Sequence, residues 1–268
     1  MIPVADALDL LRRGAMEIEG RLVDASNTTL RAVVTADGVS ARCVYKPVRG
    51  ERPLWDFPDG TLAGREVGAY LVGAATGWAP VPPTVLRDGP FGPGACQLWI
   101  DEADEEAPDA PEPLLGFAPT RKVPDGWHRI AAARDETGKP YVLAHADDVR
   151  LARLAVFDVV VNNADRKGGH ILRAGDHVYG VDHGVCFHTE TKLRTILWGW
   201  IGDPLPSDLV EVLRKIRADL DGALGGELAE HLTTAEVAAT VARTERLLSV
   251  AKFPDPPEDW PAVPWPPI

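Results

Sequence analysis

Two aspartates stand in sequence surroundings that suit them for chemistry on a phosphate group. Asp165 lies in the run N-N-A-D-R-K-G-G-H, residues 162–170, and Asp182 opens the run D-H-G. A phosphoryl transfer uses one carboxylate to orient the attacking hydroxyl and another to hold Mg²⁺ on the nucleotide phosphates. Seventeen residues separate the pair, which suits a short hairpin carrying both on neighbouring loops. The first run is also typical of an ordinary turn, because Asn, Asp and Gly tolerate turn dihedrals.

The elements that must position these residues divide into two halves. The first half reads as antiparallel strands with one central helix, and the Asp37-Gly38 pair is typical of a hairpin turn. Hydrophobic periodicity and turn residues predict helices at 5–13 and 61–76 and strands at 16–23, 28–36, 39–46, 83–87 and 95–100. An acidic, Pro-containing stretch from 101 to 113 then reads as a linker.

The second half is mainly helical. Residues 147–161 are apolar almost all round, which indicates a buried helix directly before Asp165. Helices are also predicted near 208–220 and 234–248, and short strands near 170–173 and 178–181. Residues 114–146 follow neither period clearly, and residues 253–268 form a tail rich in Pro and Trp.

A lysine and a glutamate in the first half complete a set of charged residues. Lys46 ends a β-branched strand in the run V-Y-K-P, and Glu66 lies in R-E-V-G-A-Y on the following helix. Glu66 has apolar neighbours, where a lone carboxylate is costly without a cation. We therefore expect these two side chains to pair. The alternative for Lys46 is an exposed edge strand stopped by Pro47.

The Y-K-P and R-E-x-x-A-Y runs, followed by D-R and D-x-G, resemble the phosphatidylinositol 3-/4-kinase-like and HipA-like branch of the kinase superfamily. The resemblance covers roughly residues 16–200 and implies an α+β, two-lobed protein-kinase-like fold. It places an antiparallel-sheet N-lobe at residues 1–102 and a mainly helical C-lobe at 103–268. It also implies an ATP-dependent kinase that uses Mg²⁺ or Mn²⁺.

The resemblance assigns roles to individual residues. Lys46, held by Glu66, would neutralise the phosphates, Asp165 with Arg166 would form the catalytic pair, and Asp182 would bind the metal. The family carries Asn five residues after the catalytic Asp as a second metal ligand, whereas this chain has His170. Imidazole suits Mn²⁺ better than Mg²⁺. Four readings stay open: His170 binds metal, an asparagine of 162–163 substitutes, one metal binds firmly, or transfer is lost.

Two further segments are candidates for nucleotide contacts. The polar loop after the first strand offers Ser26 and Asn27 to the phosphates, although an ordinary turn explains it equally well. The segment before the linker is predicted to meet adenine through the backbone of 98–100, and its residues are Gln97, Leu98, Trp99 and Ile100.

Composition excludes several classes of partner. The net charge of −12 argues against nucleic acid or an anionic lipid surface. No apolar run approaches the ~20 residues of a transmembrane helix, and no signal peptide is visible. Three cysteines without a C-x-x-C spacing fit a reducing cytoplasm. We expect a cytoplasmic monomer that binds nucleotide and a hydroxyl-bearing substrate.

The sequence leaves the acceptor open among a lipid, a small molecule and a protein. Residues 185–206 take the place of an activation segment, whose Thr189, Thr191 and Thr195 either receive phosphate or lie in a solvated loop. Two other classes stay open. One is a nucleotide-binding pseudokinase without transfer, and the other is an interaction protein that docks through the 253–268 tail.

Overall fold

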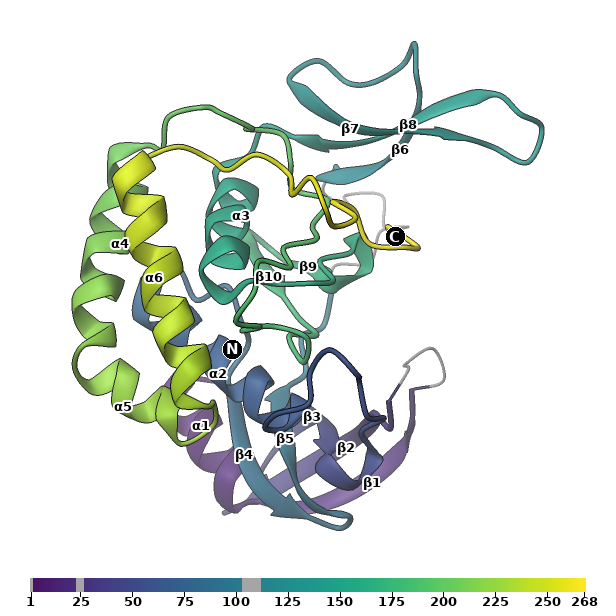
Figure 1. Ribbon diagram of the computed structural model, residues 1–268. Helices are drawn as coiled ribbons and strands as arrows, with labels where there is room; N and C mark the ends of the chain where they lie inside the picture. The colour runs from purple at the N-terminus through teal and green to yellow at the C-terminus, as the bar shows by residue number, and fades with distance from the viewer. Residues whose placement is uncertain (1, 23–26, 103–111) are drawn as a thin grey trace.

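The computed structural model describes residues 2–22, 27–102 and 112–268, and it has two lobes (Figure 1). The first lobe holds a five-stranded antiparallel sheet in the order β1-β2-β3-β5-β4. Its elements are α1 (Val4–Arg13), β1 (Ala15–Arg21), β2 (Leu30–Ala36), β3 (Val39–Pro47), η1 (Val48–Gly50), α2 (Leu62–Thr76), β4 (Thr84–Gly89) and β5 (Gly92–Leu98).

Local sequence signals explain most boundaries in this lobe. Asp37 and Gly38 both adopt positive φ, as a two-residue hairpin turn between β2 and β3 requires. The Thr61 hydroxyl caps the start of α2, and Gly77 ends that helix in the left-handed conformation. Leu10 and Leu11 of α1 pack against the sheet, where Cys43 and Cys96 lie in the same apolar cluster.

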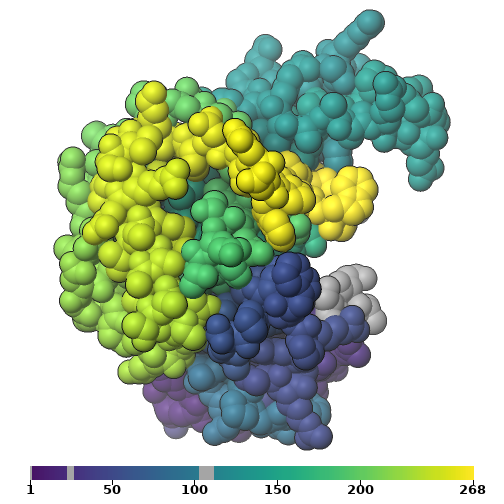
Figure 2. Space-filling view, viewed as in Figure 1, coloured from purple at the N-terminus to yellow at the C-terminus, as the bar shows by residue number. Residues whose placement is uncertain are grey.

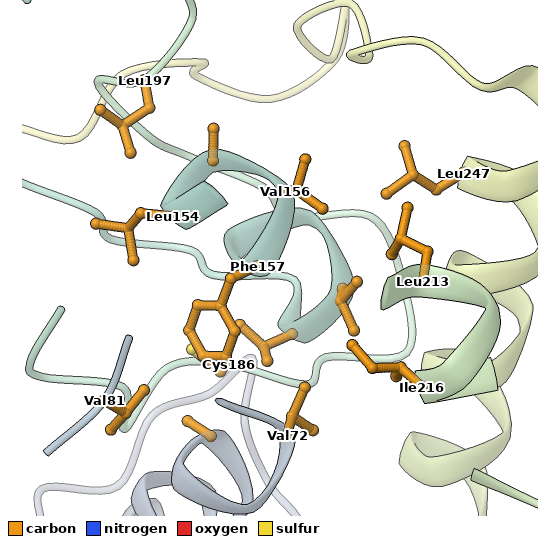
Figure 3. Packing of buried hydrophobic residues seen from close by; sticks show 14 of the residues in the cluster. Val72, Val81, Leu154, Val156, Phe157, Cys186, Leu197, Leu213, Ile216 and Leu247 are labelled. Carbon is orange, nitrogen blue, oxygen red and sulfur yellow. The ribbon is translucent and has the colours of Figure 1, made fainter. Parts of the chain in front are cut away.

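The second lobe is built around α3, which is buried as its composition predicts. Figure 3 shows Val156 and Phe157 of α3 facing apolar side chains of α2, α4 and α6. The elements of this lobe are β6 (Leu115–Pro119), β7 (Trp127–Arg134), β8 (Pro140–Ala146), α3 (Val149–Val161), η2 (Gly168–His170), β9 (Ile171–Ala174), β10 (His177–Gly180), α4 (Ser207–Leu220), α5 (Ala223–Ala229) and α6 (Thr234–Val250).

The structure adds two features to the sequence expectations. Residues 115–146 form a three-stranded sheet, β6-β8-β7, which projects from the C-lobe (Figure 1). The register of β7 shifts between Arg129 and Ala131, and this irregularity interrupts the alternation of inward and outward side chains along that strand. The short helix α5 also has no long periodic signal.

The predicted boundary between 102 and 103 borders undescribed residues and stays a prediction.

None of the helices in the described ranges combines the length and apolar content that a bilayer crossing requires. Cys43, Cys96 and Cys186 are free and buried.

A buried histidine fastens the β6-β8-β7 sheet to the C-lobe. His145 is only 1% exposed and packs against Trp200 with ring centroids 4.8 Å apart. Its Nδ1–H donates to the carbonyl of Ala146 at 2.8 Å, and Nε2 accepts from the N–H of Gly199 at 3.2 Å. Burial lowers the pKa of His145 to about 4. The folded structure therefore favours the neutral imidazole of His145 over the protonated, positively charged form.

We predict that this histidine makes folding sensitive to acid. Its folded pKa lies below the usual value, so the unfolded chain takes up a proton that the folded chain excludes. The stabilisation is complete above pH ~6.5 and is lost as the pH falls toward about 4. The loss should be on the order of 3 kcal/mol.

Denaturant unfolding between pH 7 and 4.5 tests this prediction. His145→Phe should be less stable at pH 7 but lose less stability on acidification than wild type. His177→Asn, on β10, should keep the wild-type pH dependence. Parallel curves for wild type and His145→Phe would contradict the assignment.

Candidate active site

Lys46 lies between two carboxylates that come from different lobes. It ends β3, and its Nζ donates to Glu66 Oε1 on α2 and, at 2.7 Å, to Asp182 Oδ1. Glu66 is nearly buried, with 3% of its side chain exposed, whereas the Lys46 side chain is 21% exposed. Burial opposes the charged form of Lys46, but Asp182 and Glu66 outweigh it and raise the lysine pKa. The pairing of Lys46 with Glu66 that the sequence predicts is present, and Asp182 joins it as a third charged residue.

Packing between the lobes fixes Glu66. Its neighbour Arg65 is 2% exposed and forms a buried ion pair with Glu236, the residue whose side chain also caps α6. Arg65 Nε donates to the carbonyl of Cys186 at 3.0 Å, after the D-H-G run. The other oxygen of Glu66 accepts from the N–H of His183 at 3.0 Å. Glu66 therefore connects Lys46 directly to the segment that carries Asp182.

Asp182 and His170 face each other at 3.6 Å, from Oδ2 to Nε2. Asp182 has a φ of 60°, an uncommon conformation for a non-glycine residue and one that clusters at functional sites. The ammonium of Lys46 holds the pKa of Asp182 below its usual range. His170 Nδ1 donates to the carbonyl of Asp165 at 2.8 Å. This bond leaves the Nε2 lone pair directed toward the carboxylate of Asp182.

An oxygen and a nitrogen lone pair that face each other across this gap suit a cation. A metal-binding histidine commonly donates its other ring N–H to a backbone carbonyl, as His170 does. Within residues 2–22, 27–102 and 112–268, no group of three or more His, Cys, Asp or Glu side chains is arranged to hold a metal. Two protein ligands are enough for a metal that substrate phosphates help to bind. The donor set thus fits a metal bound together with a nucleotide.

Arg166 lies below the site and has no surface exposed. It forms an equally buried ion pair with Asp158 of α3, at 2.9 Å. Its guanidinium also donates to the carbonyls of His170 and Val181, and to His183 Nε2 at 2.7 Å. Because its exposed fraction is 0%, Arg166 cannot touch a substrate. Arg166 was expected to act directly in catalysis, but its burial leaves it only a role in positioning the loops around it.

Asp165 lies above this buried network, with its carboxylate near two cations. Lys167 Nζ is 3.1 Å from Oδ2, and Arg194 Nη2 is 3.5 Å from Oδ1. Sequence reasoning gave neither residue a role beside Asp165. Lys167 lies in the same run and was visible there, whereas Arg194 reaches the site only because residue 166 pairs with Thr195 in a β-bridge.

The asparagines before Asp165 are structural. Asn162 Oδ1 accepts from the N–H of Lys192 at 2.9 Å, and its amide donates to two carbonyls of the 188–190 segment. Asn163 Oδ1 accepts from the N–H of Asp165 at 2.9 Å, and its amide donates to Asp158. Both are at most 1% exposed. Each side-chain oxygen thus already accepts one backbone N–H, and the alternative in which one of these residues replaces the missing metal ligand stays a prediction.

The candidate adenine segment lies at the other end of β3. The N–H groups of Leu98 and Trp99 donate to carbonyls within the N-lobe. A cavity of about 450 Å³ opens beside them and is also lined by Ile100. It lies near Arg42, about 13 Å along the strand from Lys46 by strand rise. Gln97 is buried and donates to Thr84 Oγ1 at 2.8 Å, so its side chain serves the sheet.

The remaining candidates differ in what the structure shows of them. Ser26 lies outside the described residues. Asn27 Oδ1 accepts from the N–H of Arg52 at 2.9 Å, in the loop after Lys46. Thr189 and Thr191 are exposed, whereas Thr195 is 2% exposed. The tail packs on its own chain, because the Ala262 carbonyl accepts from the N–H of Thr195 at 3.0 Å.

Several solved structures share this arrangement of lobes. The Golgi casein kinase with Mn/ADP bound superposes with a TM-score of 0.55 at 15% identity, covering 92% of this chain and 75% of that chain. The hydra Fam20 protein with sugar gives a TM-score of 0.52 at 12% identity, covering 92% and 88%. At such identities the likeness establishes the fold alone, which is protein-kinase-like: a sheet-based N-lobe and a C-lobe rich in helices.

No protein-family profile matches the sequence. A curated protein, Rv2133c of Mycobacterium tuberculosis, is 47% identical over 261 residues, which is 96% of this chain and 94% of that protein. The chain therefore belongs to the same family as Rv2133c.

Proposed function

We propose that the protein is an ATP-dependent phosphotransferase that moves the γ-phosphoryl group to a hydroxyl. The observation that carries the proposal is the contact of Lys46 with both Glu66 and Asp182, together with His170, which lies 3.6 Å from Asp182 and donates to the carbonyl of Asp165. Phosphoryl transfer needs a cation that faces the phosphates, a carboxylate that binds the metal and a second carboxylate that orients the acceptor. The protein-kinase-like fold supports the same conclusion by analogy.

The transfer proceeds in line between two oxygens. A bond forms from the acceptor oxygen to the γ-phosphorus, the bond to the β–γ bridging oxygen breaks, and ADP leaves with that electron pair. Asp165 orients the hydroxyl and receives its proton, which then passes to solvent. Lys46 neutralises the phosphates of the nucleotide. Lys167 and Arg194, beside Asp165, hold that carboxylate in its orientation.

Asp182 and His170 would hold the divalent metal through Oδ2 and Nε2. A bound Mn²⁺ or Mg²⁺ would supply positive charge to the phosphates of the nucleotide. The Golgi casein kinase, which shares the fold, has Mn/ADP bound, and this supports a nucleotide and a divalent metal as the ligands of this protein. A nitrogen ligand in place of an amide oxygen favours Mn²⁺.

The nucleotide base is assigned to the segment after β5. Two of its three backbone N–H groups donate within the N-lobe, which narrows the adenine contact to the N–H of Ile100. The Y-K-P and R-E-x-x-A-Y runs support membership in the phosphatidylinositol 3-/4-kinase-like branch, with the lobe boundary between 102 and 103. Asn27, beside the loop that follows Lys46, lies at the phosphate end.

A pseudokinase that binds nucleotide without transfer is the second candidate. His170 favours it, because an imidazole occupies the position where the family carries a metal-binding Asn. Measurements of binding and turnover on the same variants separate the two functions.

Lys46→Met should weaken ATP binding by about tenfold or more, because it removes the phosphate cation and leaves two carboxylates unpaired. Calorimetric titration with ATP and Mn²⁺ measures this effect, and a thermal melt confirms that the variant is folded. Lys139→Met, an exposed lysine in the β7–β8 turn, should bind ATP like wild type. Unchanged affinity in Lys46→Met would remove the lysine from the nucleotide site.

The wild-type protein should prefer Mn²⁺ to Mg²⁺, and His170→Asn should shift the preference toward Mg²⁺ by about tenfold, the scale of a lost metal contact. Each metal is titrated with ATP present, and the ratio of the two affinities is compared between variants. His177→Asn is the matched control and should keep the wild-type ratio. A ratio that His170→Asn leaves unchanged shows that His170 is not a ligand.

Asp165→Asn should reduce transfer by about 10²–10⁴-fold, the usual contribution of a positioned base. ATP affinity should stay within about threefold of wild type, because the carboxylate acts on the acceptor and not on the bound nucleotide. ATP turnover and autophosphorylation are measured beside ATP affinity. Equal turnover in both proteins favours the pseudokinase, and loss of binding as well as turnover would make Asp165 structural.

A further inference from the structure

Two basic side chains, Lys192 and Arg194, lie over the ring of Trp260, and Arg194 also contacts Asp165. Lys192 is 6% exposed, and the Oδ2 of its ion-pair partner Asp56 lies 3.7 Å away, beyond hydrogen-bond distance. The ammonium faces the rings of Trp260, at 4.3 Å, and Trp55, at 5.4 Å. The indole Nε1–H of Trp260 is buried and meets no acceptor among the described residues. Buried donors in this state cost free energy until a ligand or water accepts from them.

The position of these donors relates them to the proposed reaction. Arg194 lies over the same Trp260 ring, at 5.7 Å, and its Nη2 is 3.5 Å from Asp165 Oδ1. Its Nε donates to the carbonyl of Ala164 at 2.9 Å, which holds the guanidinium in place. The donors thus lie on the acceptor side of Asp165. Lys46, which faces the nucleotide side, has two carboxylates of its own.

The C-terminal tail forms one wall of this region. The carbonyl of Ala262 accepts from the N–H of Thr195 and, at 2.9 Å, from Trp198 Nε1, and the carbonyl of Pro267 accepts from Gly168. In Figure 2 the tail arches over the segment that follows the D-H-G run, with a hollow below it. The tail thereby presents Trp260 to Lys192 and Arg194.

We propose that Lys192, Arg194 and Trp260 form a subsite for the phosphate or carboxylate group of a small acceptor, whose hydroxyl then meets Asp165. The inference rests on the proposed function and specifies its substrate class. Two cations lie over one indole whose N–H has no acceptor among the described residues, a set of groups suited to an anion with several acceptor oxygens. Because Lys192 as a residue is only 6% exposed, we expect a compact group to reach its ammonium more easily than a bulky one.

Calorimetric titration of the full chain with inorganic phosphate and with malonate tests the subsite and separates the two anions. Wild type should bind at least one of them. Lys192→Met should weaken that binding by about tenfold or more, Trp260→Phe by a smaller factor because it keeps the ring and loses only the N–H, and Lys192→Arg should retain it. Lys122→Met, an exposed lysine of the β6–β7 loop, is the control. Equal affinity in wild type and Lys192→Met overturns the proposal.

A second pair of measurements separates this proposal from the proposed function. Lys46→Met should keep its affinity for the anion and lose affinity for ATP. Lys192→Met should lose affinity for the anion and keep its affinity for ATP. ATP turnover is then compared with glycerol, glycerol 3-phosphate, glycerate and an acidic serine peptide as acceptors. Stimulation by the phosphate or carboxylate compound over glycerol, reduced in Lys192→Met, supports the subsite. Stimulation by the peptide alone overturns it.

Discussion

The buried ion pair between Arg166 and Asp158 is the constraint on which the site depends. Both side chains are fully buried, so removing either one would leave a desolvated charge that the fold cannot tolerate cheaply. From this position Arg166 binds the carbonyls at 170 and 181 and the ring of His183. One guanidinium thus sets the spacing between the loop that carries Asp165 and the loop that carries Asp182.

A second buried ion pair, Arg65 with Glu236, joins the N-lobe helix α2 to the C-lobe. Helix α2 packs against α4 and α5 as well as against the sheet. The position of Glu66, and through it that of Lys46, is therefore set by contacts from both lobes. The charged groups of the site already face one another at hydrogen-bond distance, so the proposed phosphorylated ligand would meet a preorganised arrangement.

The charge distribution separates the two sides of the cleft. On the nucleotide side a single lysine faces Glu66 and Asp182, so a metal is needed to balance further phosphates. On the acceptor side, cations outnumber the carboxylates they meet, and the tail adds an indole donor. An overall acidic protein thereby offers a local surface suited to anions.

Local patterns in the sequence determined the hairpin at residues 37–38, the buried helix before Asp165, and the order of Lys46, Glu66 and Asp182. Each depends on turn chemistry, periodicity or a short motif, all of which act over a few residues. Tertiary structure alone decided that Arg166 is buried, that both asparagines serve the backbone, and that residues 115–146 form a sheet. It also brought Lys192 and Trp260 together. These outcomes depend on which distant groups supply hydrogen bonds and exclude water, and no local pattern carries that information.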